Sequence, residues 1–506
     1  MNGSLRFVRS LFTGATEFLF EDKSAGKTGI TGITAVTLII AAAFASHMVL
    51  LSGSSFPPGS DGYIFLVQAH SLLEGKGLHY HDPSLFYLIL TPIASVVSPV
   101  NALRISIVIV SSICAAGIFL LSRADGRSVP EQVCATAWGA FSPAGFFFCA
   151  QYPKQFLGIA LFILFLYSLR SRRIVYAVLF LVGAVLSHRF CAALALMFIV
   201  PYFLRKIGRG KTFRVVLIAG TVLLVFAAII ATVPGTLSLR DLSRLEVNHI
   251  TFPVPPIMSF AKLYGAADGI HPLIIIDAAL SLSVILRALI LIMRGKRLSA
   301  WTMSLSVSAL ILSVPLFSFA EGGAGYRLYL ATFPLSVALF AGTGFMVRRA
   351  VYAMVIALIA AGVIHDRTDD FRKYDPPYSM YERIARRTGS LLPRDTILVI
   401  AHRPLAETVD FMLHVDTLAW RPEPRFDRSR TWRIARDIDR WEISRTAGVS
   451  DNDKRIQELS ARYLLVREDL WDSFITAIPR DNTDLVSRAT GSFNPSATRP
   501  PFITER

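Results

Sequence analysis

The sequence SDGYIFLVQAHSLLEGKGLHYHDPSLFY occupies residues 60–87 and directly follows the first long apolar segment of the chain. It is a polar stretch with Asp61 and Asp82 near its two ends. Acids are scarce in this region, because only 13 of the 36 Asp and Glu residues fall within the first 365. A carboxylate just beyond a membrane segment indicates chemistry on a lipid-bound substrate. The alternative is that Ser60 or Asp61 only caps the helix that follows, and these residues alone favour neither interpretation.

The chain as a whole is predicted to be an all-α polytopic membrane protein. Of its 506 residues, 53% are hydrophobic and 17% are charged, and the mean hydropathy is +0.50, which excludes a chain that is soluble over its whole length. We expect about eleven transmembrane helices, each long enough to cross ~30 Å of hydrocarbon. The first is expected to be retained and not cleaved as a signal peptide. The predicted spans are 29–52, 100–122, 131–149, 154–170, a closely spaced pair within 174–206, 213–233, 272–293, 299–320, 328–347 and 350–365.

The distribution of basic residues predicts which side of the membrane each loop faces. Lys and Arg gather at the cytoplasmic ends of spans, and six such clusters fall on one side if the apolar stretch 85–98 does not cross. With about 14 residues, that stretch is too short for a span and is predicted to be an interfacial or re-entrant helix. The N-terminus is then cytoplasmic and the C-terminus extracytoplasmic. The predicted outer loops are 53–99, 150–153, 187–190, 234–271 and 321–327.

The net charge of +16 belongs to the membrane part of the chain. Residues 366–506 hold 24 basic and 23 acidic residues, a net of +1, so residues 1–365 carry the remaining +15. Lys and Arg in the cytoplasmic loops account for this charge, and nucleic-acid binding is therefore not expected. The four cysteines lie in or beside predicted spans, so neither a disulfide framework nor a metal cluster is predicted.

The composition changes after residue 365 and divides the chain into three regions. A cytoplasmic segment (1–28) precedes a transmembrane module (29–365), and a small extracytoplasmic α/β domain (366–506) follows. Strands that alternate with helices predict this domain class. Its predicted elements are helices at 379–392 and 455–461 and strands at 396–401 and 462–468.

The first outer loop contains several candidate functional residues. Residues 63–74 form a predicted amphipathic helix that lies along the membrane surface and ends at Gly75. His79, His81 and Asp82 follow it. These three could ligate a metal, but two histidines separated by one residue in a loop are a weak metal signal. A turn that Asp82 stabilises before the next proline is the favoured alternative.

Three later outer loops each place a cation at the outer membrane boundary. Lys154 opposes the positive-inside trend, and it either extends to the interface or pairs with a lipid phosphate. Arg189 is costly at its position unless it meets an anion or water. Arg327 is suited to bind phosphate through paired N–H donors, unless it pairs with Glu321. The substrate-binding candidates are Asp82, His81, Tyr152, Lys154, His188, Arg189, Tyr326 and Arg327.

Six short segments carry a family resemblance: SDGY (60–63), AHSLLEGKG (69–77), DPSLFYLIL (82–90), YPKQFLGIALFILFLYSL (152–169), LSHRF (186–190) and GYRLYLATFP (325–334). Together with a cytoplasmic N-terminus and an acid soon after the first span, they resemble the GT-C superfamily. Its members are integral-membrane glycosyltransferases that use polyprenyl-phosphate-linked sugars. They include oligosaccharyltransferases, protein mannosyltransferases and lipid A aminoarabinose transferases. The resemblance covers residues 29–347.

The resemblance implies an inverting sugar transfer at the outer face of the membrane, from a polyprenyl-phosphate-linked donor to a glycan, lipid or protein acceptor. Asp61 would be the general base for the acceptor hydroxyl, and Arg327, Lys154 and Arg189 would stabilise the leaving phosphate. The second outer loop lacks the Asp-x-Asp of metal-using oligosaccharyltransferases, so neither a metal nor another cofactor is expected. The expected location is a bacterial plasma (inner) membrane. The alternatives are an O-antigen polymerase or ligase type enzyme and a multi-pass transporter.

Overall fold

The structure is a computed structural model in which the described residues form two compact units. The first comprises Met1–Gly53, Pro83–Ile89 and Arg104–Phe371, and the second comprises Ser54–Asp82, Leu90–Leu103 and Arg372–Arg506. The first outer loop therefore groups with the C-terminal part of the chain. The described residues are 30–59, 61–79, 83–188, 190–206, 272–294, 300–313, 330–343, 378–391, 398–400, 403–414, 417–419, 432–436, 463–467 and 502–503.

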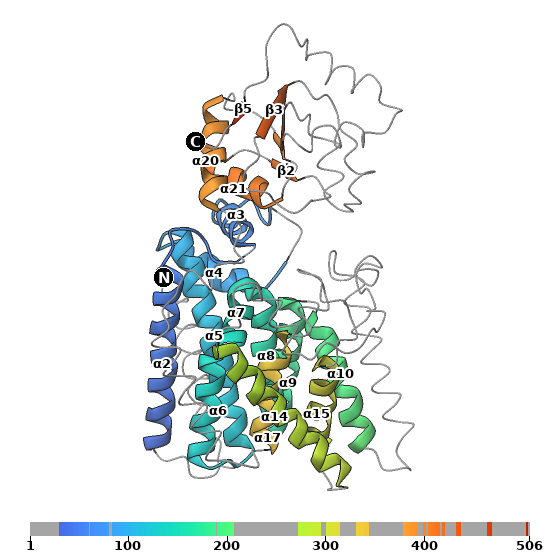
Figure 1. The fold of residues 1–506 in the computed structure, drawn as a ribbon. Coiled ribbons are helices and arrows are strands. Elements are labelled where there is room, and N and C mark those ends of the chain that lie inside the picture. Colours follow the sequence, from blue (N-terminus) through green and yellow to red (C-terminus); the bar gives the residue numbers. More distant parts are fainter. Residues whose placement is uncertain are drawn as a thin grey trace, which may run out of the picture. The chain divides into compact units, whose positions relative to one another are not determined.

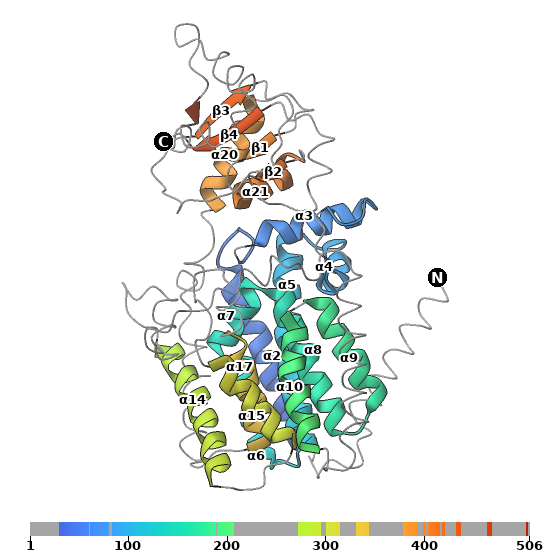
Figure 2. The ribbon, with the colours of Figure 1, turned by 90° about the vertical axis from the view of Figure 1, so that its right-hand side faces the viewer.

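The first unit is a bundle of apolar helices that run side by side (Figures 1 and 2). Helix α2 packs against α6, α8 against α9, and α10 against α15, while α17 contacts α6, α14 and α15. Aromatic and aliphatic side chains fill its interior, among them Trp138, Phe148 and Phe162. Its described helices are α2 (Ile30–Ser52), most of α5 (Pro99–Ala124), α6 (Val129–Phe141), α7 (Pro143–Gln151), α8 (Pro153–Arg170), α9 (Ile174–Ser187), α10 (Phe190–Lys206), α14 (Pro272–Met293), α15 (Ala300–Ser313) and α17 (Thr332–Thr343).

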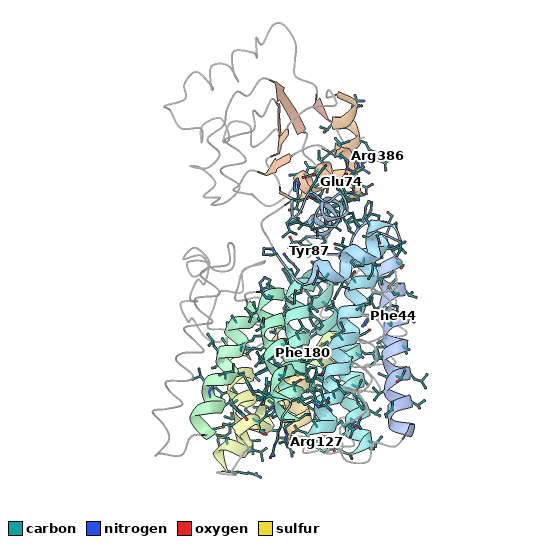
Figure 3. The ribbon with its side chains drawn as sticks, turned by 180° about the vertical axis from the view of Figure 1, so that it is seen from behind. Phe44, Glu74, Tyr87, Arg127, Phe180 and Arg386 are labelled. Atoms are coloured by element: carbon teal, nitrogen blue, oxygen red, sulfur yellow. The ribbon has the colours of Figure 1, made fainter. Side chains whose placement is uncertain are left out.

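Three of the helices described are long and apolar enough to cross a membrane, at Gly32–Ser52, Pro99–Ala124 and Pro153–Arg170. The bent pair of α6 and α7 makes a fourth if it counts as one span. Tyr87 and Arg127 lie at opposite ends of this bundle (Figure 3). Their positions agree with the predicted outer and inner ends. The predicted spans at 213–233 and 350–365 lie outside the described residues.

The span predicted at 131–149 consists of two helices. Helix α6 ends at Phe141, α7 begins at Pro143, and the two helices are bent by 44°. Proline has no N–H to donate, and its ring clashes with the preceding turn, so Pro143 breaks the helical hydrogen-bond ladder. Ser142 then caps α7 by accepting a hydrogen bond from the Gly145 N–H at 2.9 Å.

The second unit combines three helices with a five-stranded sheet. Its helices are α3 (Gly62–Leu73), α20 (Tyr378–Leu391) and α21 (Arg403–Leu413). The strands are β1 (Leu398–Ile400), β2 (Thr417–Ala419), β3 (Trp432–Arg436), β4 (Tyr463–Arg467) and β5 (Phe502–Ile503), in the order β2-β1-β4-β3-β5. Strand β1 is parallel to β2 and β4, and β3 is antiparallel to β4 and β5. Helix α21 connects the parallel strands β1 and β2, as parallel pairing requires.

Several of these elements lie where the sequence placed them. Helix α20 and strands β1 and β4 fall within the predicted segments 379–392, 396–401 and 462–468, to within one residue. Helix α4 (Phe86–Ala94) has nine residues. At 1.5 Å per residue that is about 14 Å, too short to cross a membrane. The predicted helix at 455–461 lies outside the described residues.

The helix predicted at 63–74 is present as α3, but the prediction that it has a single apolar face is wrong. Helix α3 buries nine of its twelve residues, including Gln68 and Ser71, and it packs against α21 of the same unit. A helix that is buried around most of its circumference has protein on several sides. Its partner is a helix more than 300 residues further along the chain, which local periodicity cannot reveal.

Candidate functional site

Asp61 lies in a tight turn that leads into α3. Gly59 has a φ of +87°, a left-handed conformation that favours glycine, and its carbonyl accepts the Gly62 N–H at 3.3 Å. At Gly62 an added Cβ would lie 2.9 Å from Pro57 Cβ, closer than real Cβ atoms come. The two glycines thus allow the chain to double back just before the helix.

Asp61 occupies the N-cap position of α3 but does not cap it with its side chain. Its backbone carbonyl accepts the Phe65 N–H at 3.4 Å, while its carboxylate makes no capping hydrogen bond. Within the part of the chain that the structure describes, this half-buried carboxylate has no hydrogen-bond or ion-pair partner. The capping alternative therefore does not account for Asp61. Ser60 lies outside the described residues.

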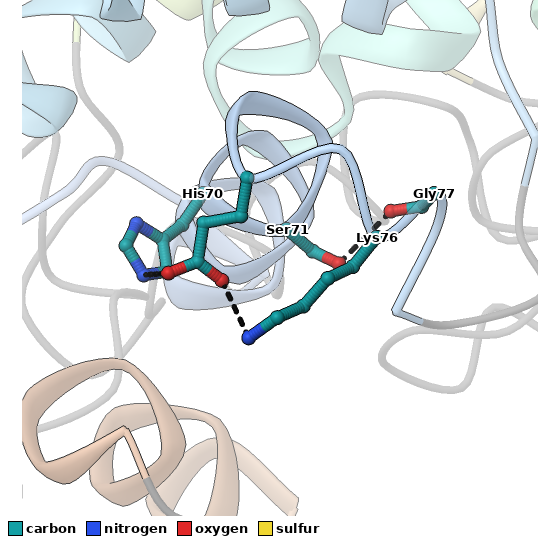
Figure 4. A network of polar contacts seen from close by, with 5 residues as sticks. His70, Ser71, Lys76 and Gly77 are labelled. Atoms are coloured by element: carbon teal, nitrogen blue, oxygen red, sulfur yellow. Dashed lines mark hydrogen bonds and ion pairs between the residues drawn. The ribbon is translucent and has the colours of Figure 1, made fainter.

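The other end of α3 is held by exposed polar contacts (Figure 4). Glu74 pairs with His70 at 3.2 Å and with Lys76 at 2.8 Å, and the Ser71 hydroxyl donates to the Gly77 carbonyl at 2.9 Å. The hydrogen bond from Lys76 is the largest cause that lowers the pKa of Glu74. These contacts close the end of the helix and leave the Glu74 carboxylate paired with Lys76 and His70.

His79 is engaged by the C-terminal domain. Its Nε2 lies 3.0 Å from Asp410 Oδ2 in α21, and both side chains are largely buried, with 15% and 10% of their surface exposed. This contact gives His79, one member of the suggested metal group of His79, His81 and Asp82, a partner in the C-terminal domain. The last two lie outside the described residues.

In the first unit, Lys154 lies at the start of α8 and against α4. Tyr152 is the N-cap residue of α8 and makes no side-chain capping bond. Lys154 Nζ lies 5.9 Å from the centroid of the Tyr87 ring, within the range of a weak cation–π contact. A lysine in the first turn faces the positive end of the helix dipole, which also attracts anions.

His188 forms the break between α9 and α10 and adjoins Lys154 through Gln155. Its Nδ1 accepts the Phe190 N–H at 3.1 Å, so the neutral ring carries its proton on Nε2. Nε2 lies 3.2 Å from the side-chain amide nitrogen of Gln155. If the Gln155 amide is turned by 180°, its oxygen accepts the proton on His188 Nε2.

The segment that follows Asp82 makes a hydrogen bond to the end of α9. The Ser84 hydroxyl donates to the Ser187 carbonyl at 2.8 Å, where α9 ends. The structure therefore connects Lys154 with Tyr87, and it connects the α9–α10 break at His188 with Ser84 and Gln155. Sequence reasoning had not assigned a role to Ser84, Tyr87 or Gln155. The remaining candidates, His81, Asp82, Arg189, Tyr326 and Arg327, lie outside the described residues.

Asp277 is a buried acid whose structural role the sequence did not reveal. Its Oδ1 accepts the Trp138 indole N–H at 2.7 Å, and its Oδ2 accepts the Ser142 hydroxyl at 2.6 Å and the Ala144 N–H at 3.2 Å. One carboxylate of α14 thus satisfies three donors at the bend between α6 and α7. The Ser142-Pro143 pair inside an apolar run is the only local signal of this bend, and it does not identify the partner.

Comparisons with known proteins extend the description of the fold. Neither the protein-family models nor the curated proteins gave a sequence match. Among solved structures, ArnT from Cupriavidus metallidurans is similar in its apo state, with a TM-score of 0.52, 12% identity, and coverage of 76% of this chain and 86% of ArnT. The same protein bound to undecaprenyl phosphate gives a TM-score of 0.51 at 11% identity, with coverage of 78% of this chain and 87% of ArnT.

The oligosaccharyltransferase of Archaeoglobus fulgidus gives a TM-score of 0.49 at 13% identity, with 78% of this chain covered. This chain spans 65% of the length of that oligosaccharyltransferase. This chain therefore shares its overall fold with ArnT, and at the level of the fold the structural likeness agrees with the resemblance seen in the sequence.

Proposed function

We propose that this chain is a membrane glycosyltransferase that transfers a sugar from a polyprenyl-phosphate-linked donor to an extracytoplasmic glycan, lipid or protein. The observation that carries the proposal is Asp61. It is placed at a helix N-terminus by two glycines, and its carboxylate caps nothing. A carboxylate that has no hydrogen-bond or ion-pair partner among the described residues is available to take a proton, as the general base of an inverting transfer must.

The cations of the first unit suit the donor. Lys154 and the dipole of α8 favour an anion at the same helix end, and His188 contacts Gln155, the residue that follows Lys154. A polyprenyl phosphate carries negative charge before the reaction and gains more as the sugar leaves, so both states are stabilised there. Arg189 and Arg327 are assigned to the same phosphate from the sequence alone.

The proposal includes a membrane topology. Eleven spans, a cytoplasmic N-terminus and an extracytoplasmic C-terminal domain place Asp61 on the outer side of a bacterial plasma membrane. We also propose that the transfer needs no metal ion. The second outer loop, residues 150–153, contains no acid to bind one.

Replacing Asp61 by Asn tests the assignment directly. Asn has the size of Asp but cannot accept the proton, so the transfer rate should fall by about 10²-fold or more. The rate is measured as undecaprenyl phosphate released from a panel of undecaprenyl-phosphate-linked sugars, with cell-envelope fractions as acceptor. The variant should stay folded and still bind undecaprenyl phosphate.

Glu74→Gln is the matched control on the same loop, and we expect it to keep its activity, because Glu74 forms only exposed ion pairs. Activity of Asp61→Asn near that of the wild type would remove Asp61 from the site and the proposed mechanism with it.

A further inference from the structure

Two hydrogen bonds connect α20 to the segment around Asp61, one at the backbone of Gly59 and the other at the side chain of Tyr63. The Tyr378 hydroxyl donates to the Gly59 carbonyl at 2.7 Å, and the Tyr63 hydroxyl donates to Glu382 Oε1 at 2.6 Å. Tyr378 and Glu382 are four residues apart in a helix, so they lie on the same face. Gly59 and Tyr63 each lie two residues from Asp61, which leaves the turn between two fixed points.

The two phenols are buried, which makes these bonds costly to lose. Tyr63 and Tyr378 expose 2% and 3% of their surface, and their rings pack edge to face with centroids 5.0 Å apart. Burial first, and then the bond to Glu382, raises the pKa of Tyr63 well above its usual value. The phenol therefore remains protonated and acts as a donor. A buried donor without its acceptor is strongly unfavourable.

The far end of the same segment is attached to the C-terminal domain as well. His79 pairs with Asp410 of α21 at 3.0 Å, and α3 packs along α21 between the two ends. Contacts to α20 and α21 thus hold both the beginning and the end of the segment that starts with Asp61. All of these residues belong to the second unit.

We infer that Tyr63, Glu382 and Tyr378 are positioning residues through which the C-terminal domain holds Asp61 in its working position. This inference rests on the proposed role of Asp61 as the general base. The Asp61 carboxylate has no partner of its own within the described parts of the chain. Its position is therefore set by the backbone that carries it. Displacing a catalytic group by 1 Å can cost up to ~10²-fold in rate.

Variants of the Tyr63–Glu382 pair test the inference kinetically. Tyr63→Phe and Glu382→Ala should each lower kcat by roughly 10-fold and leave the KM for the undecaprenyl-phosphate-linked sugar unchanged, because only the base is displaced. The double variant should be no worse than the poorer single variant, since both remove one bond. Glu382→Gln keeps an acceptor oxygen for the Tyr63 hydroxyl and should restore kcat.

Arg386→Ala is the matched control. Arg386 lies 3.6 Å from the other Glu382 oxygen, and its side chain is 74% exposed. Such an exposed pair contributes little to stability, so kcat should equal that of the wild type. Loss of activity in this control would show that the charge of α20 matters and not the bond to Tyr63, and would overturn the inference.

Hydrogen–deuterium exchange provides a readout that needs no substrate. Amides of residues 54–66 should exchange faster in Tyr63→Phe and Glu382→Ala, and at the wild-type rate in Arg386→Ala. Unchanged exchange, or a lower melting temperature with unchanged kcat per folded molecule, would overturn the inference. If Asp61→Asn is fully active, the proposed function fails. Exchange still reports whether α20 holds the turn, so the two failures are distinguishable.

Discussion

Asp61 and Lys154 both lie at helix N-termini, where the helix dipole affects their charges in opposite ways. A carboxylate is stabilised there, and an ammonium group is destabilised by about 0.3–1 kcal/mol. Lys154 is the second residue of α8 and lies over the Tyr87 ring. An anion bound at this helix end would offset the unfavourable placement. A lysine that merely extends to the membrane interface would gain no such compensation.

Replacing Lys154 by Gln should separate these two interpretations. If Lys154 binds the donor phosphate, binding of undecaprenyl phosphate to the purified full chain should weaken roughly 10-fold, or about 1.4 kcal/mol. The melting temperature should stay the same or rise slightly, because the repulsion with the dipole is removed. Native mass spectrometry or a fluorescence titration measures the binding.

Lys76→Gln serves as the control for that experiment. Lys76 is 71% exposed and forms an exposed ion pair with Glu74 at 2.8 Å (Figure 4). We expect its binding of undecaprenyl phosphate to equal that of the wild type. Equal binding by Lys154→Gln would exclude Lys154 from the phosphate site.

At the scale of the elements, the bend between α6 and α7 depends on a contact with α14, a helix far away in the sequence. Pro143 ends α6, which the sequence permits one to foresee. The donors near this bend are the Trp138 indole, the Ser142 hydroxyl and the Ala144 N–H. All three donate to Asp277 of α14, which lies 135 residues beyond Ser142. Buried donors need acceptors. We therefore interpret Asp277 as a structural residue, and not as part of a transport pathway.

Removing the Asp277 carboxylate should destabilise the bundle. Asp277→Ala leaves the Trp138, Ser142 and Ala144 donors without an acceptor, at a cost of about 1–3 kcal/mol for each buried group left unpaired. Asp277→Asn should be intermediate, because its NH₂ group faces a donor. Melting temperatures in detergent should fall in the order wild type, Asn, Ala.

Ser281→Ala, one turn further along α14, is the control for position. The Ser281 hydroxyl is buried and has no hydrogen-bond partner among the described residues. Its loss should leave the melting temperature nearly unchanged. A large decrease for Ser281→Ala, or none for Asp277→Ala, would contradict the role assigned to Asp277.

The same elements indicate how far the sequence could predict this protein. Apolar length and periodicity located α2, α5, α8, the α9–α10 break and α20 closely, because these features are local. The role of Tyr378 and Glu382 had no local signal. They contact residues 319 positions away, and an ordinary amphipathic helix such as α20 does not specify which helix or turn it meets. For the same reason α3 was predicted as a surface helix.

At the scale of the whole molecule, the second unit begins again at Arg372, close to the boundary predicted at residue 365, but it is not made of the C-terminal part alone. The first outer loop belongs to the same compact unit as the C-terminal domain. Helices that pack directly against each other outside the apolar bundle, as α3 and α21 do, must lie on one side of a membrane. The side that holds residues 54–82 must therefore also hold residues 372–506, which ties the location of Asp61 to that of the C-terminus.

Cysteine labelling in intact cells or spheroplasts tests this topology. Ser450→Cys should react with an impermeant thiol reagent, because the C-terminal domain is predicted to be outside. Arg172→Cys, in the turn between α8 and α9, should react only after the membrane is permeabilised. Arg172 is exposed, so protection in intact cells would reflect the membrane and not burial. The four native cysteines are all buried and should give little background. The reverse labelling pattern would place Asp61 in the cytoplasm and exclude transfer at the outer face.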